Sequence, residues 1–271
     1  MGDASDFDAK RLRRLAVRIR MRATDMVAIQ GFGYLGQALS SAEIFAVLFG
    51  GAVRFGHDRF VLSPGHYVIS LYAAAAETGR LDPAELASYG KDGVELEAIG
   101  SERTPVADLV CGSLGQGLSG AIGFALAAQL AAEDRDVFAF LSDGEMEEGQ
   151  VWEAAMFASH HRHRMGRLIV VIDANNSQVD GSVTSVTTLE PLAEKWRAFG
   201  FGVAEVDGHD CDALREVLSR LPLEADRPSA IICHTIKGKG FAFAEGDPGW
   251  HHKSTIDKKM IAQMYEALGA A

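Results

Sequence analysis

The sequence predicts an α/β fold with a mainly parallel sheet and helices on both of its faces. Two runs of apolar residues, at 137–141 and 168–172, are typical of parallel strands that are buried on both sides. Residues 147–161 between them have a helical pattern, so the order is strand, helix, strand. The chain of 271 residues is long enough for one large domain of this kind.

The segments before these two strands alternate between helix and strand patterns. Residues 10–22 carry basic side chains interleaved with apolar ones, which predicts a first helix with one solvated basic face. Three acidic residues and no apolar run precede it, so a targeting peptide is not expected. Next in the chain we expect a capping box at 40–43 that opens a helix over 44–49, followed by a strand at 59–62. We then expect a helix over 67–78 that Gly79 stops, and the start of another helix at 81–83. Residues 89–105 are expected to form an irregular, exposed loop.

The segments that follow continue the alternation. Residues 112–117 (GSLGQG) lead into an Ala-rich helix over 118–132, which is apolar all round and therefore expected to be buried. Beyond the second strand we expect a helix over 189–199, a strand at 202–206, a helix over 211–221 and a last buried strand at 229–234. Residues 1–245 are expected to form the single domain, followed by a tail, 246–271, that carries Trp250-His251 and a short helix.

Charge and composition exclude several functional classes. The net charge of −11 argues against a nucleic-acid-binding surface. No apolar run reaches the length of a transmembrane helix, so we expect no membrane partner. The three cysteines are scattered and lack metal-binding spacing, which predicts a reduced, cytoplasmic protein.

Polar clusters follow both buried strands, at the edge where an open parallel sheet binds ligands. Asp143-Gly144 ends the first strand, and Asn175-Asn176 ends the second. A carboxylate and an amide oxygen suit a hard divalent cation, and Gly144 lets backbone N–H groups approach a phosphate. Each cluster alone is also a common turn or loop, and only their pairing favours a metal–diphosphate site.

Other candidate ligand motifs are weaker. No P-loop pattern is present, and the G-x-G-x-x-G match at 31–36 follows a helical pattern, so we discount it as a dinucleotide fingerprint. Residues 112–117 could approach a ligand with their backbone or could form a helix-entry turn. His66 could be a phosphate donor or acid–base group, or it could cap a loop.

Taken together, these motifs resemble a known signature. Residues 143–154 (DGEMEEGQVWEA), Asn175 and Asp180-Gly181 are similar to the thiamine diphosphate signature of transketolases, and most similar to the separately encoded N-terminal subunit. Counterparts extend along nearly the whole chain, at 62–66 (LSPGH), 112–117, 206–210 (VDGHD) and 235–240 (TIKGKG).

The resemblance implies a thiamine diphosphate-binding domain of the PP type and assigns roles to individual residues. Metal ligands for Mg²⁺ or Ca²⁺ would be Asp143, Asn175 and the backbone carbonyl of Ser177. Cofactor contacts would come from His66, Gly112, Ser113, Leu114, Gly144, Glu145, Asn175 and His251. Catalytic roles would fall to His66, His251 and Glu148. Glu148 could instead be a helix N-terminal carboxylate that the helix dipole favours.

The resemblance also implies a partner. A complete transketolase joins three domains in one chain, and this sequence matches only the diphosphate-binding one. We therefore expect the chain to be inactive alone and to need a C-terminal subunit with the pyrimidine-binding domain, most simply as an α₂β₂ assembly. The expected reaction moves a two-carbon ketol unit from a ketose donor to an aldehyde acceptor.

Two departures from the family pattern leave the substrate open. Tyr34 stands where the family has a histidine, and Ser101 lies near the place of a second one. In the family these imidazoles contact sugar hydroxyls, so their loss suggests a changed donor or acceptor. Two other hypotheses therefore remain beside a split transketolase. One is a related enzyme that passes the unit to a non-sugar or carrier-bound acceptor, and the other is a non-catalytic subunit.

Overall fold

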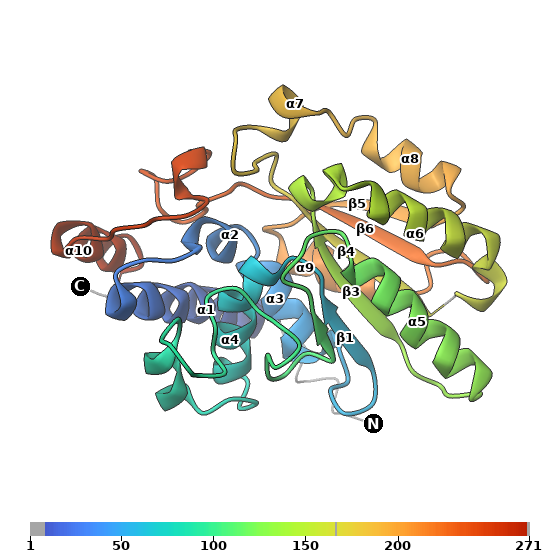
Figure 1. Ribbon diagram of the computed structural model, residues 1–271, viewed down its shortest axis with the longest axis horizontal. Helices are drawn as coiled ribbons and strands as arrows, with labels where there is room; N and C mark the ends of the chain where they lie inside the picture. Colours follow the sequence, from blue (N-terminus) through green and yellow to red (C-terminus); the bar gives the residue numbers. More distant parts are fainter. Residues whose placement is uncertain (1–8, 166, 270–271) are drawn as a thin grey trace.

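A single six-stranded sheet forms the centre of the protein. The computed structural model describes residues 9–165 and 167–269, and every pairing between the described strands is parallel, in the order β2-β1-β3-β4-β6-β5 (Figure 1). The strands are β1 Arg59–Leu62, β2 Leu109–Val110, β3 Val137–Ser142, β4 Leu168–Ala174, β5 Gly202–Asp207 and β6 Ser229–His234. The predicted fold class is therefore confirmed.

Both faces of this sheet are covered, which explains why its strands are continuously apolar. Along β3, Phe138 and Phe140 point into one core cluster, whereas Val137, Ala139 and Leu141 point into the other. Successive side chains of a strand alternate between faces, so a run without polar residues supplies both cores at once.

One layer of helices packs on the first face and a second layer on the other (Figure 1). The first layer consists of α1 Ala9–Gln30, α2 Leu35–Ser40, α3 Ala42–Val47, α4 Val68–Glu77 and α9 Cys211–Ser219, with α10 Lys258–Ala267 against α1. The second layer consists of α5 Gly117–Leu130, α6 Gly149–His160 and α8 Leu192–Ala198. Short helical turns cover Leu48–Ala52, Gly65–Tyr67, Pro83–Ser88, Gly144–Glu147, Arg162–Arg164, Val183–Val186 and Pro248–Trp250.

The predicted capping box at residues 40–43 is wrong. Ser40, the serine of the predicted box, donates its hydroxyl to Asp173 at 2.8 Å, and Ser41, which is the observed N-cap residue, makes no side-chain cap bond. Glu43 does not turn back to the helix start either, since its carboxylate binds the guanidinium of Arg20 at 2.6 Å. A tertiary ion pair has taken the place of the local motif.

Two predictions of exposure are also corrected. Helix α5 buries only one face: Leu118 and Ala121 are fully buried, whereas Leu130 is 78% exposed. The irregular segment 89–105 is not exposed throughout, because Tyr89 and Leu96 are in the core.

The C-terminal residues pack onto the N-terminal ones. Trp250 and Met264 are buried, and Lys253 exchanges backbone hydrogen bonds with Gly33. The division into a domain over 1–245 and a tail over 246–271 stays a prediction. Within the described ranges, no helix has both the length and the apolar character needed to cross a membrane.

Candidate functional site

A cavity of about 220 Å³ lies at the carboxyl ends of the central strands. After β1 the chain passes to β2 on one side, whereas β3 lies on the other, so the cavity sits where the strand order reverses, the usual ligand position in open α/β sheets. Its lining residues are His66, Tyr67, Leu114, Ser142, Gly144, Glu145, Glu147, Glu148, Ser177, Gln178, Val179, Asp180, Lys237 and His251.

Asp143 is held at the end of β3 by the backbone. One carboxylate oxygen accepts from the N–H of Gly144 at 2.8 Å, and the other accepts from the N–H of Asn176. Burial, with the charge of Asp173, raises the pKa of Asp143 to about 7. Gly144 must be a glycine here, because a Cβ would lie 2.8 Å from the Cβ of Gln178.

The amide of Asn175 has a fixed orientation. Its Nδ2 donates to Tyr67 Oη at 3.1 Å and to Asp173 Oδ2 at 3.0 Å, so Oδ1 faces the opposite way and accepts from Ser177 N at 3.0 Å. Asp173 is fully buried and also accepts from Tyr67 Oη at 2.8 Å. The carboxylate of Asp173, a residue of β4, therefore leaves the amide oxygen of Asn175, rather than an N–H, available to a cation.

Lys237 lies three residues beyond the end of β6 and brings an ammonium group into the cavity. It is 2% exposed, and its Nζ lies 3.1 Å from the carbonyl oxygen of Ser177 and 2.9 Å from Nδ1 of His251. Burial lowers the pKa of Lys237 to about 8, against the opposing charges of Asp143 and Asp173. Because the ammonium donates to Nδ1 of His251, the ring proton of His251 lies on Nε2.

Two imidazoles and a phenol form an aromatic group at the cavity. The ring centroids of His66 and His251 are 5.2 Å apart, and the ring of Tyr34 lies 5.6 Å and 6.0 Å from them. Burial lowers the pKa of both histidines to about 3, helped by the charge of Lys237. Both rings are therefore neutral at physiological pH. Ser101 is turned elsewhere, because its hydroxyl donates to Glu97 at 2.6 Å.

Glu145 holds the glycine-rich loop 112–117 against the turn that follows β3. Its Oε1 accepts from Ser63 Oγ and from the N–H of Gly115 at 2.9 Å. Burial raises the pKa of Glu145 to about 7. Gly115 has φ +83°, and a Cβ there would lie 2.9 Å from the Cβ of Glu148, so the close approach of loop and turn requires glycine.

The structure brings most of the predicted residues together, in different ways. His66, Leu114, Gly144, Glu145, Glu148, Ser177 and His251 line the cavity. Asp143 and Asn175 are buried beside it. Gly112 and Ser113 are exposed on the same loop as Leu114 but outside the lining. Glu148 is the N-cap residue of α6 and makes no side-chain cap bond.

Sequence reasoning missed Lys237, Tyr67 and Asp173. Lys237 follows a third buried strand, β6, which pairs with β4. Because the carboxyl ends of neighbouring parallel strands lie at the same edge of a sheet, the polar residues after β6 could have been predicted to lie at the site. Asp173 and Tyr67 carried no separate signal, because their roles depend on contacts between segments far apart in the chain.

The donor set fits a hard cation with a diphosphate. Among the described residues, no cluster of three or more His, Cys, Asp or Glu side chains could hold a metal by itself. One carboxylate with neutral oxygens and phosphates is, however, the usual environment of Mg²⁺. Three buried side-chain oxygens of lining residues have no hydrogen-bond partner among the described residues: Glu145 Oε2, Glu147 Oε1 and Ser177 Oγ. Such orphaned atoms are expected where a polar ligand belongs.

Comparison with known sequences points to one family. The family model described as "Transketolase, thiamine diphosphate binding domain" matches residues 12–271. The chain is 36% identical over 261 residues to the 6-deoxy-6-sulfo-D-fructose transketolase subunit of Clostridium sp. (strain MSTE9), covering 93% of this chain and 92% of that protein. It is 30% identical over 241 residues to an apulose-4-phosphate transketolase subunit of Phocaeicola vulgatus, covering 86% of this chain and 85% of that protein.

Solved structures show the same fold. The transketolase of Campylobacter jejuni matches with a TM-score of 0.86 at 26% identity over 97% of this chain, and that of Leishmania mexicana with 0.87 at 29% over 95%. The chain covers only 43% and 41% of these two proteins. The fold of this chain therefore corresponds to one part of each of these two transketolases.

Proposed function

Because the chain belongs to the transketolase family of transferases and carries its thiamine diphosphate-binding domain, we propose that it binds thiamine diphosphate with Mg²⁺ or Ca²⁺ and transfers a two-carbon ketol unit together with a separate pyrimidine-domain subunit. The observation that carries the proposal is that Asp143 and Asn175 are buried at the adjacent ends of β3 and β4, beside the cavity that Lys237 lines with its ammonium group.

The cation is held by oxygens from two strand ends. Asp143 supplies the anionic oxygen, and Asn175 Oδ1 and the carbonyl of Ser177 supply neutral ones. Asp173 and Tyr67 support this set by fixing the Asn175 amide. A bound divalent charge favours the ionised form of Asp143, in opposition to the burial that raises its pKa.

The diphosphate would be held by nitrogen donors that line the same cavity. Lys237 presents its ammonium, and His66 and His251 present neutral imidazoles that can donate one N–H each. The backbone at Gly144 approaches closely because no side chain intervenes. Leu114, with Gly112 and Ser113 on the same loop, would contact the rings of the cofactor, and Glu145 holds that loop in place.

When bound, thiamine diphosphate supplies the carbanion chemistry of ketol transfer. The protein's own task is then to orient the reactants and to hold protons at defined atoms. His66 and His251 are assigned proton transfer with the substrate, because their rings are adjacent and both line the cavity. Glu148, exposed at the cavity and at the start of α6, is assigned a proton-transfer role that involves the partner subunit. Its alternative role, a carboxylate favoured by the helix dipole, requires no partner.

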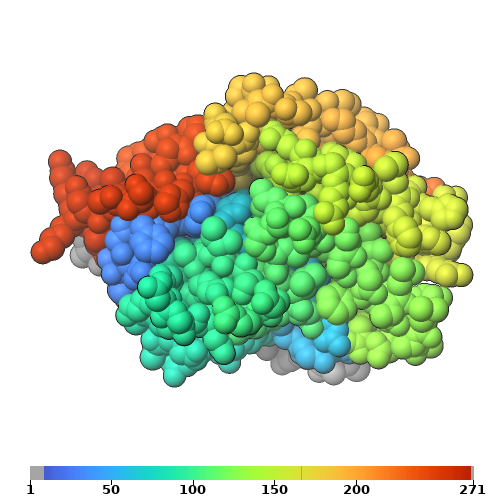
Figure 2. Space-filling view, in the orientation of Figure 1, coloured from blue at the N-terminus to red at the C-terminus, as the bar shows by residue number. Residues whose placement is uncertain are grey.

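Another polypeptide is needed to complete the site, and an exposed apolar groove between α5 and α6 supports this. The groove has a volume of about 430 Å³. It is lined by Ser119, Ile122, Gly123, Leu126, Gln150, Glu153, Ala154 and Phe157, on helices at the surface drawn in green and yellow-green in Figure 2. Gln150 lies two residues from Glu148 of the cofactor cavity, so a protein seated in the groove also reaches the cavity. An α₂β₂ assembly is the simplest arrangement.

The substrate is a small ketose–aldehyde pair of unassigned identity. Tyr34 replaces an imidazole by a phenol beside His66, and its ring also lies 4.7 Å from that of His252. This favours, as a second candidate, transfer to a non-standard acceptor that is not a sugar or is carrier-bound. Relatives named for a sulfo-sugar and for apulose 4-phosphate are in keeping with varied substrates in such subunits. A cytoplasmic location stays a prediction and is supported by three free, buried cysteines.

Reconstitution tests the proposed reaction. The purified chain, with and without a pyrimidine-domain subunit, is assayed with xylulose 5-phosphate and ribose 5-phosphate. We expect no ketol transfer by the chain alone and turnover by the pair, which the Asp143→Asn variant should lose. Full turnover by the isolated chain would contradict the proposal. Failure of a pair that still binds thiamine diphosphate would favour the second candidate.

A further inference from the structure

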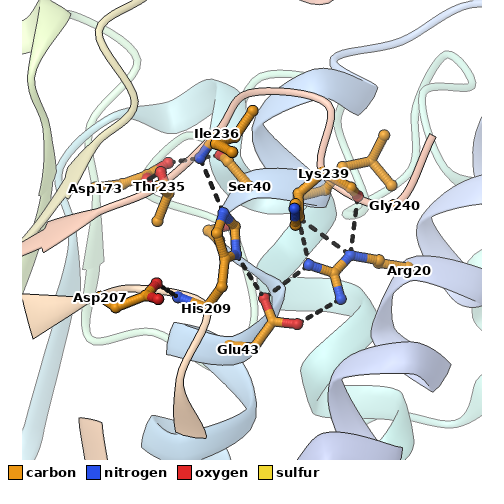
Figure 3. Close-up of polar contacts among 12 residues, drawn as sticks. Arg20, Ser40, Glu43, Asp173, Asp207, His209, Thr235, Ile236, Lys239 and Gly240 are labelled. Atoms are coloured by element: carbon orange, nitrogen blue, oxygen red, sulfur yellow. Dashed lines mark hydrogen bonds and ion pairs between the residues drawn. The ribbon is translucent and has the colours of Figure 1, made fainter. Parts of the chain in front are cut away.

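The loop that carries Lys237, residues 235–240, rests on a polar cluster outside the cofactor cavity. The cluster consists of Arg20 on α1, Glu43 on α3 and His209 beyond β5, and Figure 3 shows their contacts. Its side chains are largely buried, with relative exposures of 7%, 12% and 15%. Charged groups at this depth are costly unless they are paired and hydrogen-bonded, which these are.

His209 binds the loop directly. The N–H of Ile236 donates to Nε2 of His209 at 2.9 Å, and Nδ1 of the same ring lies 3.1 Å from Glu43 Oε2. Since Nε2 accepts, the ring proton lies on Nδ1 and faces the carboxylate. The carboxylate thereby fixes both the tautomer and the orientation of the imidazole.

Arg20 binds the loop a second time, on the other side of Lys237. Its guanidinium forms two hydrogen bonds with Glu43, at 2.6 and 2.7 Å, and its Nε donates to the carbonyl of Lys239 at 3.1 Å. A two-pronged pair of this kind has a rigid geometry. The backbone of the loop is therefore held at residues 236 and 239, and Lys237 lies between these two points.

Lys237 is the group in the loop whose position matters for the cavity. Its Nζ contacts Ser177 O and His251 Nδ1 on the cavity wall. A long, flexible ammonium side chain makes such contacts only if its backbone is well placed, because its own rotamers are many. The cluster thus contacts the backbone of this short loop, whereas the ammonium contacts the cavity wall.

We propose that Arg20, Glu43 and His209 are positioning residues that act through Lys237: they fix the loop 235–240 so that its ammonium stays at the cofactor cavity. The part that concerns cofactor affinity rests on the proposed function. The part that concerns the placement of the loop rests on the hydrogen bonds alone.

Substitution of His209 separates its hydrogen bond from its bulk. His209→Gln keeps an acceptor for the N–H of Ile236, whereas His209→Leu fills similar space without one. With the full-length chain, Mg²⁺ and thiamine diphosphate, we expect the dissociation constant to rise about tenfold in His209→Leu and to recover most of the way in His209→Gln. His234→Leu is a matched control: His234 directly precedes the loop and also pairs with a glutamate, Glu205, but among the described residues its side chain makes no hydrogen bond to the loop.

A double-mutant cycle tests whether His209 acts through Lys237. If it does, His209→Leu should change the dissociation constant by less than about twofold once Lys237→Met is in place, since there is no ammonium left to position. The same tenfold effect in both backgrounds would overturn the proposal, because the two residues would then act independently.

Hydrogen exchange gives a readout that needs no cofactor. The amide of Gly238 donates to Gly36 O, a bond that the substitution does not remove, so its exchange reports on the loop as a whole. We expect exchange at Gly238 to quicken about tenfold in His209→Leu while amides of β4 keep their wild-type rates. Unchanged exchange at Gly238 would overturn the proposal even if the wild type binds thiamine diphosphate. Quickened exchange in a chain that binds none would uphold the loop placement and refute the proposed function.

Discussion

Lys237 shows why a functional residue can escape a sequence pattern. A lysine beyond a strand end is normally solvated, and burial of its ammonium requires partners that the sequence does not reveal. Here the partners are Ser177 and His251, which lie 60 and 14 residues away. By contrast, the location of Asp143 and Asn175 at adjacent strand ends was predictable, because each directly follows an apolar strand.

Glu43 illustrates the opposite case, in which a local motif was predicted and a distant contact prevailed. Burial by itself would raise the pKa of Glu43, but hydrogen bonds from His209 and Arg20 lower it by more. The pKa of Glu43 is therefore below the ordinary value of 4.5. A carboxylate with a lowered pKa contributes stability that is present above pH 4.5 and is lost as the pH falls through the folded-state pKa.

Glu43→Gln should therefore lower the free energy of unfolding by about 3–5 kcal/mol at pH 7, because it leaves the buried Arg20 without its counter-charge. The deficit relative to wild type should shrink as the pH falls below about 4.5, because Glu43 of the unfolded wild-type chain then takes up a proton while Glu43 of the folded protein is still ionised. Urea unfolding of both proteins between pH 3.5 and 7 measures this. A deficit that is constant over this range would show that the charge of Glu43 does not stabilise the fold.

Among the elements, the strands were the most predictable and the helix surfaces the least. Strand β6 was predicted at its observed bounds, Ser229–His234, because its apolar residues supply both cores. Helix α5 was expected to be buried all round, yet one side of it faces outward. Its small residues, among them Gly123, leave open space in the groove with α6. Composition alone cannot distinguish a closely packed helix from one that forms a groove.

The groove between α5 and α6 leads to a test of association. Phe157 is 45% exposed on its rim, so Phe157→Glu should change the free energy of unfolding by no more than about 0.5 kcal/mol. The same variant should weaken association with the pyrimidine-domain subunit by about tenfold or more, as expected for an aromatic contact buried in an interface. Leu130→Glu, on α5 but outside the groove, serves as the control, and sedimentation velocity measures both.

If Phe157→Glu associates as tightly as the wild type while the control also behaves normally, the partner does not cover this groove. The elements that cover the cofactor cavity would then have to be sought around Leu114 and Val179, which are also exposed apolar residues beside it.

For the whole molecule, fold and family followed from the chain, whereas the substrate did not. The parallel sheet places the carboxyl ends of β1, β3, β4 and β6 side by side. Loops that are far apart in the sequence therefore meet at one site. The identity of the substrate depends on Tyr34 and on surfaces that a second subunit supplies. The cofactor can therefore be inferred from this one chain, whereas the acceptor cannot.

The central claim is that the cation and diphosphate contacts lie on this chain. Calorimetric titration of the purified chain with thiamine diphosphate tests it most directly, with and without Mg²⁺ and beside the Asp143→Asn variant. We expect saturable binding that requires Mg²⁺, is lost in Asp143→Asn and is not reproduced by thiamine without its phosphates. Absence of binding by the wild type, or Mg²⁺-dependent binding that Asp143→Asn leaves unchanged, would contradict the account.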